Sequence, residues 1–361
     1  ETKQITIDAS GAIFGEQYIR KAHSMFGWDW GAQLPDAGIF RDIELQAYNV
    51  ARIEEVKYHQ EHYEDHVMLQ VETVLERSMD NCGETSMEVL IYDPQGQLLD
   101  KHIMTTEDEV TYVSEFAIHN PQLWWVNGLG QQPLYRVEAR LLINGKEAQK
   151  NTDRIGLRTF TVSREKDQWG EEFAFVINGV KFFTMGADYI PEDCIYSRIT
   201  RERLEYLIQS SIRAHYNCLR VWGGGYYPSD EFYDLCDEYG LIVWQDLMYA
   251  CNVYDVTKEF EESIIAETID NVKRLRHHAS LGLWCGNNEI ESAWAYWGNY
   301  QTQSQYLRAD YIKQFEYILP KALKEVDNET FFWPSSPSSG GCFDEPGDEN
   351  RGDTHYWDVW H

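Results

Sequence analysis

Basic residues are scarce in this sequence. Its 31 lysines and arginines face 60 aspartates and glutamates, which gives a formal net charge of −29 over 361 residues. The negative charge is spread along the whole chain, without a basic stripe that could neutralise the phosphates of nucleic acid or of an anionic membrane surface. The sequence therefore predicts neither nucleic acid nor a membrane as a partner.

Long apolar runs and paired cysteines are lacking as well. No run approaches the roughly 20 apolar residues that span a bilayer, and the beginning of the chain does not resemble a signal peptide. The seven cysteines are scattered without a Cys-x-x-Cys pair, which favours buried free thiols over a disulfide framework or a zinc site. The compartment stays open, because the chain starts at Glu1 within strand-like sequence and we expect it to be truncated there.

Cofactor motifs are also missing. The run Gly223-Gly224-Gly225 has neither the Gly-x-Gly-x-x-Gly spacing of a dinucleotide site nor the Lys-Ser/Thr of a P-loop, so it predicts a tight turn after a strand. No spacing of His, Asp or Glu suggests a metal site. The sequence therefore predicts no cofactor and no metal.

Apolar residues make up 43% of the chain, and its length suffices for two or three domains with their own cores. Residues 3–49 and then 51–164 alternate apolar and polar side chains in short segments, which is typical of antiparallel strands with one face on a core. The longer series contains the turn signals 93–96 (Asp-Pro-Gln-Gly) and 144–145 (Asn-Gly). It predicts a β-sandwich of immunoglobulin-like type over 51–164.

The period changes after residue 164, where short apolar strands alternate with longer helical stretches. The expected strands centre on Phe183, Leu219, Ile242, Leu283 and Phe332, with 354–360 as a sixth. The expected helices cover 200–216, 229–239, 257–278 and 304–326. This alternation predicts parallel strands with right-handed crossovers. An eight-stranded barrel needs two more strands, so we expect that the chain is truncated at its end too and that further sequence completes the barrel.

Residues 281–291 (Leu-Gly-Leu-Trp-Cys-Gly-Asn-Asn-Glu-Ile-Glu) form the stretch around which the rest is organised. Their first half reads as a strand buried on both faces, and their second half is polar where that strand would leave the sheet. Catalytic groups in barrels of alternating strands and helices lie at the carboxyl ends of the strands, so Asn288 and Glu289 are site candidates. The alternative is that Asn287 caps the next helix and Glu289 occupies its first turn without a role.

Residues 26–31 (Phe-Gly-Trp-Asp-Trp-Gly) are hard to explain as ordinary strand. A carboxylate between two indoles could present Asp29 to the hydroxyls of a sugar, with the aromatic rings as a flat apolar surface. The alternative is a tryptophan-rich turn in a core, with Asp29 bonded to backbone amides.

Six segments together resemble the β-mannosidases among the family-two glycoside hydrolases. These segments, which span nearly the whole chain in order, are 26–31, 219–225 (Leu-Arg-Val-Trp-Gly-Gly-Gly), 243–246 (Val-Trp-Gln-Asp), 284–289 (Trp-Cys-Gly-Asn-Asn-Glu), 334–337 (Pro-Ser-Ser-Pro) and 355–360 (His-Tyr-Trp-Asp-Val-Trp). The resemblance implies a fold class with three parts: 1–50 as the end of a jelly-roll sugar-binding domain, 51–164 as an immunoglobulin-like sandwich, and 165–361 as the first six strands of a catalytic (β/α)8 barrel.

The resemblance also implies roles for individual residues. Glu289 would be the general acid/base of a retaining exo-β-mannosidase, and Asn288 would bond the 2-hydroxyl of the sugar. The nucleophile, a second glutamate, is expected beyond His361. Glu291 is not a substitute, because it lies two positions along a helix and points to another side of it. Asp29 would bind hydroxyls of a terminal mannose, which suits an oligosaccharide substrate with terminal β-mannose.

Further residues are substrate-binding candidates with structural alternatives. Trp222, Trp333 and Trp357 would line the pocket or pack in the barrel core, and core packing is preferred for Trp244. Arg220 would pair with a carboxylate in the barrel mouth, and His355 would bond a hydroxyl or a carboxylate. Asp188 stands where the family pattern leads us to expect Asn, which leaves its role open.

Competing functions remain. Other family-two activities are exo-β-glucosaminidase, endo-β-mannosidase, β-galactosidase and β-glucuronidase, which differ in how the 2- and 4-hydroxyls are held. A protein of another class, one that binds carbohydrate without catalysis, becomes the better hypothesis if the natural protein ends at His361. The sequence leaves a homodimer open.

Overall fold

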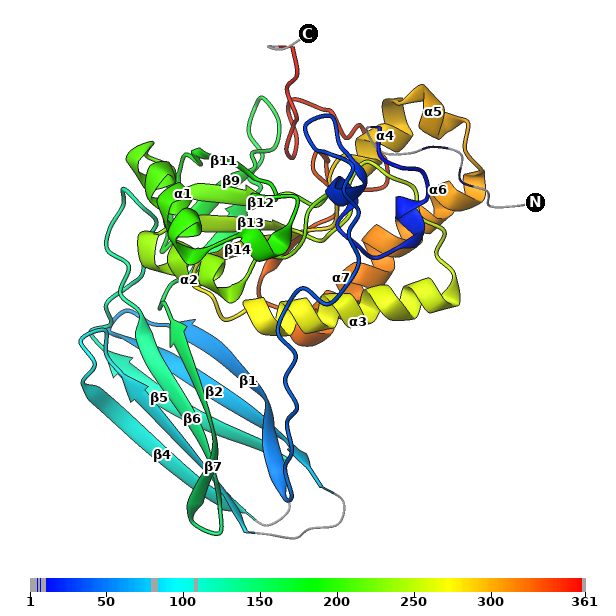
Figure 1. Ribbon diagram of the computed structural model, residues 1–361. Coiled ribbons are helices and arrows are strands. Elements are labelled where there is room, and N and C mark those ends of the chain that lie inside the picture. Colours follow the sequence, from blue (N-terminus) through cyan, green and yellow to red (C-terminus); the bar gives the residue numbers. More distant parts are fainter. Residues whose placement is uncertain (1–4, 6, 8–10, 79–83, 107–109, 359–361) are drawn as a thin grey trace.

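The computed structural model describes residues 5, 7, 11–78, 84–106 and 110–358. Figure 1 shows a β-sandwich, an α/β part built on a parallel sheet, and an irregular N-terminal segment that runs from the α/β part along the sandwich to the start of β1. Within these residues no helix has the length and apolar character needed to cross a membrane.

The sandwich consists of two antiparallel sheets that share one core. The first sheet has the order β1 (Ala51–His62), β2 (His66–Arg77), β5 (Thr111–His119), and the second has the order β4 (Leu98–Thr106), β3 (Thr85–Tyr92), β6 (Tyr135–Ile143), β7 (Lys146–Ile155). Alternate residues such as Leu69 and Val71 of β2 and Val89 of β3 are fully buried between the sheets. The period-2 pattern of the sequence places these side chains on the inner face.

A short three-stranded sheet, β8 (Phe160–Ser163), β9 (Ala174–Ile177) and β10 (Val180–Phe182), joins the sandwich to the α/β part. The expected boundary at 164 lies too late for this arrangement, because β8 pairs with β9 and not with the sandwich strands. Phe175 of β9 and the preceding Phe173 pack against Trp244 and Trp333 at the inner face of the parallel sheet. Aromatic side chains therefore cover this face of the parallel sheet.

The α/β part contains a parallel sheet whose spatial order follows the sequence. Its strands in the described part of the chain are β11 (Gly186–Tyr189), β12 (Cys218–Val221), β13 (Ile242–Asp246), β14 (Leu281–Cys285) and β15 (Phe331–Trp333). Every residue of β14 is buried, which explains its continuous apolar run. The expected centre of the first strand, Phe183, is wrong: pairing starts only where Gly186 meets Cys218, and Phe183 is exposed.

Helices connect these strands and cover the outer face of the sheet. They are α1 (Arg201–Arg213), α2 (Asp230–Tyr239), α3 (Lys258–Leu275), α4 (Ile290–Tyr296), α5 (Gly298–Gln301), α6 (Gln305–Ile312), the π-helical η4 (Lys313–Ile318) and α7 (Leu319–Val326). The Thr257 side chain caps α3 by accepting from the Phe260 amide, and Ile264, Val272 and Leu275 form its buried stripe. Figure 1 shows α3 and α7 packed side by side.

Two expected sets of strands are absent from the described residues. The N-terminal segment has only the short helices η1 (Glu16–Tyr18) and η2 (His23–Phe26), and its Ile39, Ile43 and Leu45 are exposed. A strand needs hydrogen-bonded neighbours, and in the described part of the chain no sheet pairs with this segment. The expected sixth strand is also wrong over 354–358, which is irregular; residues 359–361 lie outside the described part.

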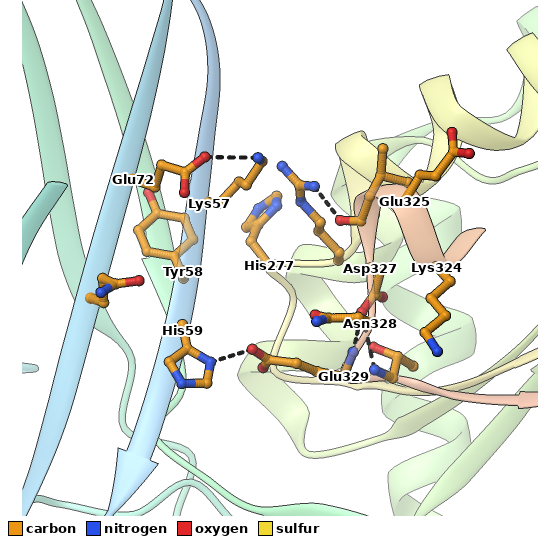
Figure 2. A pocket seen from close by; sticks show the side chains of 14 residues that line it. Lys57, Tyr58, His59, Glu72, His277, Lys324, Glu325, Asp327, Asn328 and Glu329 are labelled. Atoms are coloured by element: carbon orange, nitrogen blue, oxygen red, sulfur yellow. Dashed lines mark hydrogen bonds and ion pairs between the residues drawn. The ribbon is translucent and has the colours of Figure 1, made fainter. Parts of the chain in front are cut away.

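Polar contacts hold the sandwich against the α/β part. The indole of Trp124 donates to the Asp237 carbonyl at 2.8 Å, and the Arg158 guanidinium donates to the Ala279 carbonyl at 2.6 Å. A cleft of about 390 Å³ opens beside these contacts, between β1 and the loop after α7 (Figure 2). Its lining mixes both charge signs, with the ion pairs Lys57–Glu72 and His59–Glu329 on its walls. The cleft lies at the amino end of β15, away from the carboxyl ends of the strands.

Candidate active site

An ion pair joins β12 to β13 near the carboxyl edge of the parallel sheet. The guanidinium of Arg220 meets the carboxylate of Asp246 twice, at 2.8 Å (Nη2 to Oδ2) and 3.2 Å (Nε to Oδ1). Asp246 also accepts from the Gly223 amide and from the Trp244 indole. Burial raises the pKa of Asp246 although Arg220 opposes the shift, so this fully buried carboxylate is held in place against a desolvation cost.

Arg220 also reaches the strands on either side. Its Nη2 donates to the Asn288 side-chain oxygen at 3.0 Å, and its Nη1 lies 3.7 Å from Asp188 of β11. Burial alone would lower the pKa of Arg220, but the charges of Asp246 and Asp188 outweigh it and hold the pKa above its usual value. One guanidinium thus links side chains from β11 and β13 with the loop after β14.

The chain turns sharply after β14. A Cβ at Gly286 would lie 2.2 Å from the Pro334 carbonyl oxygen, so only glycine fits there. Asn287 then accepts from the Ile290 amide, which gives it the capping role that was the structural alternative. Glu289 does not occupy the first turn of α4: it has a left-handed backbone with a φ of 63° and precedes that helix.

The backbone of Glu289 is strained and firmly held. A non-glycine residue in this conformation costs on the order of 1–3 kcal/mol, a cost that clusters at functional sites. The amide of Glu289 donates to the Ser336 carbonyl at 2.8 Å, and Asn288 forms parallel bridges with both Ala250 and Ser336. The loops after β13 and β15 therefore fix the direction in which the Glu289 side chain leaves the sheet.

The carboxylate of Glu289 has one partner on each oxygen. Oε1 lies 2.8 Å from Nδ1 of His355, and Oε2 lies 3.2 Å from the thiol sulfur of Cys251. Burial would raise the pKa of Glu289, but the contacts with His355 and Cys251 outweigh burial and hold the pKa below its usual value. The side chain keeps 16% of its surface exposed. A half-buried carboxylate of this kind is ionised at rest and remains open to a ligand.

His355 belongs to the irregular residues 354–358. Because its Nδ1 faces a carboxylate, that nitrogen carries the proton, and Nε2 can accept from Nη1 of Arg220 at 3.4 Å. Ser336 lies 3.0 Å from the same Nε2 and donates to the half-buried Asp353 at 2.6 Å. The structure thus brings together Arg220, Asn288, Glu289 and His355, which the sequence singled out separately.

The N-terminal aromatic motif lies at this edge of the sheet as well. Trp28 and Trp30 meet the ring of Trp222 edge-on, with ring centroids 4.8 and 5.6 Å apart. Trp222 directly follows β12 and is buried by these contacts. Asp29, between the two indoles, is exposed, and no hydrogen bond or ion pair of its carboxylate is found among the described residues.

Trp333 and Trp357, two candidates for a pocket wall, differ in their exposure to solvent. Trp333 is 1% exposed and packs against Phe173, while its indole donates to Asp353 at 2.6 Å. Of the two alternatives for Trp333, the structure has core packing, because Phe173 beside β9 covers the ring. Trp357 is 52% exposed, and its place in a pocket wall stays a prediction.

Sequence reasoning missed three members of the cluster. Asp246, the last residue of β13, and Cys251, in the loop after it, were passed over although they lie at the sheet edge that holds Asn288 and Glu289. Asp353 bonds Ser336 and Trp333 from a loop whose sequence gives no periodic signal. For Asp246 alone there was a signal, a charged residue at the end of a buried strand.

Groups that could hold a metal lie elsewhere. Asp237 and His278 form one with Asp234, but Asp237 already accepts from the Ser280 amide and bonds His278 at 2.7 Å. A second group, Asp65, His66 and His119, lies on the surface of the sandwich. Neither group includes a residue that contacts Glu289.

Two families match separate parts of this chain. Residues 51–158 match "Glycosyl hydrolases family 2", and residues 3–41 match "Glycosyl hydrolase 2 galactose-binding domain-like". The protein "Beta-mannosidase B" of Emericella nidulans is 35% identical over 350 residues, which cover 95% of this chain and 41% of that protein. The chain belongs to glycosyl hydrolase family 2.

Other relatives extend this family-two match. "Beta-mannosidase B" of Aspergillus terreus is 35% identical over 359 residues, 95% of this chain and 41% of the relative. A β-D-mannosidase crystal structure from Dictyoglomus thermophilum superposes with a TM-score of 0.88 at 32% identity, covering 98% of this chain and 42% of that one. The family-two chain thus spans about two fifths of the length of these relatives.

More distant solved structures share the fold alone. A β-glucuronidase from Parabacteroides merdae superposes with a TM-score of 0.64 at 16% identity, over 78% of this chain and 34% of that chain. At this identity the likeness concerns the arrangement of the sheets and says nothing about the sugar that this family-two chain accepts.

Proposed function

We propose that the protein is a retaining exo-β-mannosidase that removes terminal non-reducing β-D-mannose from oligosaccharides, with Glu289 as its general acid/base. The observation that carries this proposal is the position of Glu289: directly past a buried parallel strand, strained, and held on both carboxylate oxygens. The relatives at 32–35% identity are named as β-mannosidases, which supports mannose as the sugar.

The architecture proposed with this function has three parts. Residues 1–50 are the end of a jelly-roll sugar-binding domain, and the two-sheet sandwich is immunoglobulin-like. The parallel sheet is the first part of a (β/α)8 barrel. The galactose-binding-like match over 3–41 and the in-order parallel pairing of β11 to β15 support this arrangement.

The chemistry requires a proton on the glycosidic oxygen as the bond breaks. Glu289 gives that proton and later removes one from the water that attacks the intermediate. At rest His355 and Cys251 favour the ionised form of Glu289. The negative charge of a second carboxylate, about 5–5.5 Å away in retaining enzymes, opposes that preference and raises the pKa of the acid. We assign this nucleophile to a glutamate of the protein outside residues 1–361.

The neighbouring polar groups bind the sugar in this proposal. Asn288 uses its oxygen for Arg220 and one amide hydrogen for Cys251, which leaves its second amide hydrogen for the 2-hydroxyl. His355 and Arg220 keep these groups oriented and border the sugar. Asp29 of the N-terminal segment and the ring of Trp222 after β12 face the terminal mannose, which limits the enzyme to chain ends.

The substitution Glu289→Gln in the natural protein tests the role of Glu289. We expect kcat/KM for phenyl β-mannoside to fall about 10²- to 10⁴-fold, the usual contribution of general acid catalysis. The loss should be much smaller for 2,4-dinitrophenyl β-mannoside, whose leaving group needs no proton. Glu291→Gln is the matched control, because Glu291 is buried two residues away without touching Glu289.

Two results would contradict parts of the proposal. Equal turnover of phenyl β-mannoside by wild-type protein and by Glu289→Gln would remove Glu289 from catalysis. A panel of aryl β-glycosides tests the sugar separately: a higher kcat/KM for a β-glucosaminide, β-galactoside or β-glucuronide would replace mannose as the substrate while leaving the role of Glu289 intact.

A further inference from the structure

Cys251 contacts both candidate residues at the end of β14. Its sulfur lies 3.2 Å from Oε2 of Glu289 and 3.3 Å from the side-chain nitrogen of Asn288. Cys251 is 4% exposed, and it lies five residues past the last residue of β13. The thiol therefore lies between the loop after β13, to which it belongs, and the two candidate site residues after β14.

Backbone pairing between the loops after β13 and β14 places Cys251 beside Glu289. Ala250 and Asn288 form a parallel bridge, and the Cys251 amide donates to the Asn288 carbonyl at 2.9 Å. The next residue on each side of the bridge, Cys251 and Glu289, has a left-handed backbone, with φ values of 44° and 63°. Two strained residues placed opposite each other turn the thiol and the carboxylate toward one another.

We propose that Cys251 is a positioning residue for Glu289, whose thiol donates to Oε2 while His355 holds Oε1. The two donors come from different loops, after β13 and after β15, so together they fix both the position and the plane of the carboxyl group. This inference rests on the proposed function for its catalytic consequence, but the contact itself does not.

The thiol is a donor here and not a thiolate. Burial and the charge of Glu289 raise the pKa of Cys251 well above its usual value, so the proton stays on sulfur. Asn288 donates to the sulfur from the other side, which leaves the S–H free to point at Oε2. The same burial excludes a role for Cys251 as a nucleophile.

Three other groups act on Glu289 from neighbouring elements. His355 bonds Oε1 from residues 354–358, the charge of Arg220 acts from β12, and the Tyr300 hydroxyl belongs to α5. His355 and Arg220 are unchanged when Cys251 is replaced, so an effect of the replacement reports the thiol contact.

The substitution Cys251→Ala in the natural protein tests the inference. Loss of the donor disfavours ionised Glu289, so the basic limb of the kcat/KM profile for phenyl β-mannoside should move up by about half a pH unit or more, given a weak hydrogen bond. The fall in kcat should exceed any change in KM, and it should be small for 2,4-dinitrophenyl β-mannoside. Cys251→Ser, which restores a donor, should return the profile toward that of the wild type.

Cys285→Ala is the matched control. Cys285 is also fully buried, in β14, but its thiol donates to the Asn287 carbonyl at 3.5 Å and not to Glu289. It should lower the unfolding temperature about as much as Cys251→Ala and leave the pH profile unchanged. An equal shift of the profile in both variants would show a general packing effect and overturn the inference.

A second readout separates this inference from the proposed function. The protein labelled with carboxyl-¹³C glutamate is titrated without substrate, and the Glu289 signal is assigned by its absence in Glu289→Gln. A higher pKa of Glu289 in Cys251→Ala supports the contact even if Glu289 proves to have no part in catalysis. An unchanged pKa in both Cys251 variants overturns the inference even if Glu289→Gln is inactive.

Discussion

Two ion pairs, one in the sandwich and one in the parallel sheet, differ in how much of their side chains is exposed to solvent. In the sandwich, Lys57 and Glu72 pair across two strands with 37% and 31% of their side chains exposed. At the carboxyl edge of the parallel sheet, Arg220 and Asp246 pair with 13% and 0% exposed. The Lys57–Glu72 pair lies across β1 and β2 and is partly open to the solvent. The carboxylate of Asp246, in contrast, is buried where parallel strands end together, and the Gly223 amide in the loop after β12 donates to it. The second arrangement suits a site.

Among these predictions, the largest effect is expected from removing one partner of each ion pair, because the free energy of unfolding should fall much more in the parallel sheet than in the sandwich. Arg220→Met leaves Asp246 buried without its counter-charge, so we expect a loss of about 3–5 kcal/mol in the free energy of unfolding. Lys57→Met in the sandwich should change it by about 0–1 kcal/mol. Urea unfolding of both variants measures the difference. Equal losses would mean that Asp246 is solvated in solution and that the contrast between the two regions does not hold.

A cavity in the sandwich core should lower the stability of the protein without changing the pH dependence of its activity. Leu69→Ala removes a fully buried side chain from between the sheets, so we expect a loss of about 2–5 kcal/mol. The pH profile of aryl mannoside hydrolysis should remain that of the wild type at temperatures where the variant is folded. A shifted profile would show that the sandwich core reaches the Glu289 cluster.

A pH effect of smaller size is expected at Glu291. Burial, aided by the charge of Glu316, raises the pKa of this carboxyl from 4.5 to about 7, although the Phe343 amide donates to it. The folded-state pKa exceeds the unfolded one, so the contribution to stability is complete below pH 4.5 and is lost as the pH rises through about 7. Glu291→Gln should therefore gain stability relative to wild type between pH 5 and pH 8.

Urea midpoints of the wild type and of Glu291→Gln at the two pH values provide the measurement. Glu72→Gln, an exposed change in the sandwich, is the control and should show the same difference from wild type at both. If the urea midpoints of Glu291→Gln and the wild type differ by the same amount at both pH values, the carboxyl of Glu291 is in contact with solvent and its pKa is not raised.

Much of the fold could be predicted because local patterns match it. The alternation over 51–155 predicted the sandwich strands, and the apolar runs around Leu219, Ile242, Leu283 and Phe332 became β12 to β15. The same alternation failed over the N-terminal segment, where Ile39 and Leu45 are exposed. An alternating pattern shows that a segment suits a sheet, but not that a partner strand lies beside it.

The candidate site could be predicted in part. The polar residues after β14 were found because they interrupt a buried run, and Trp222 was found beside a glycine turn. The position of Trp333 was left open because a tryptophan at a strand end suits either a core or a pocket, and only the packing of Phe173 decides between them. Cys251 was missed because a single cysteine in a loop has no pattern of its own.

The sequence by itself determined where β12 to β15 lie, since burial demands an apolar run and its end is visible. The tertiary structure decided which of those ends meet. Arg220 bonds Asp246, and His355 and Cys251 hold Glu289, through contacts between residues 26 to 66 positions apart. Such contacts depend on strand register and on the left-handed residues Cys251 and Glu289 in the loops after β13 and β14. These are properties of the folded chain that no local pattern encodes.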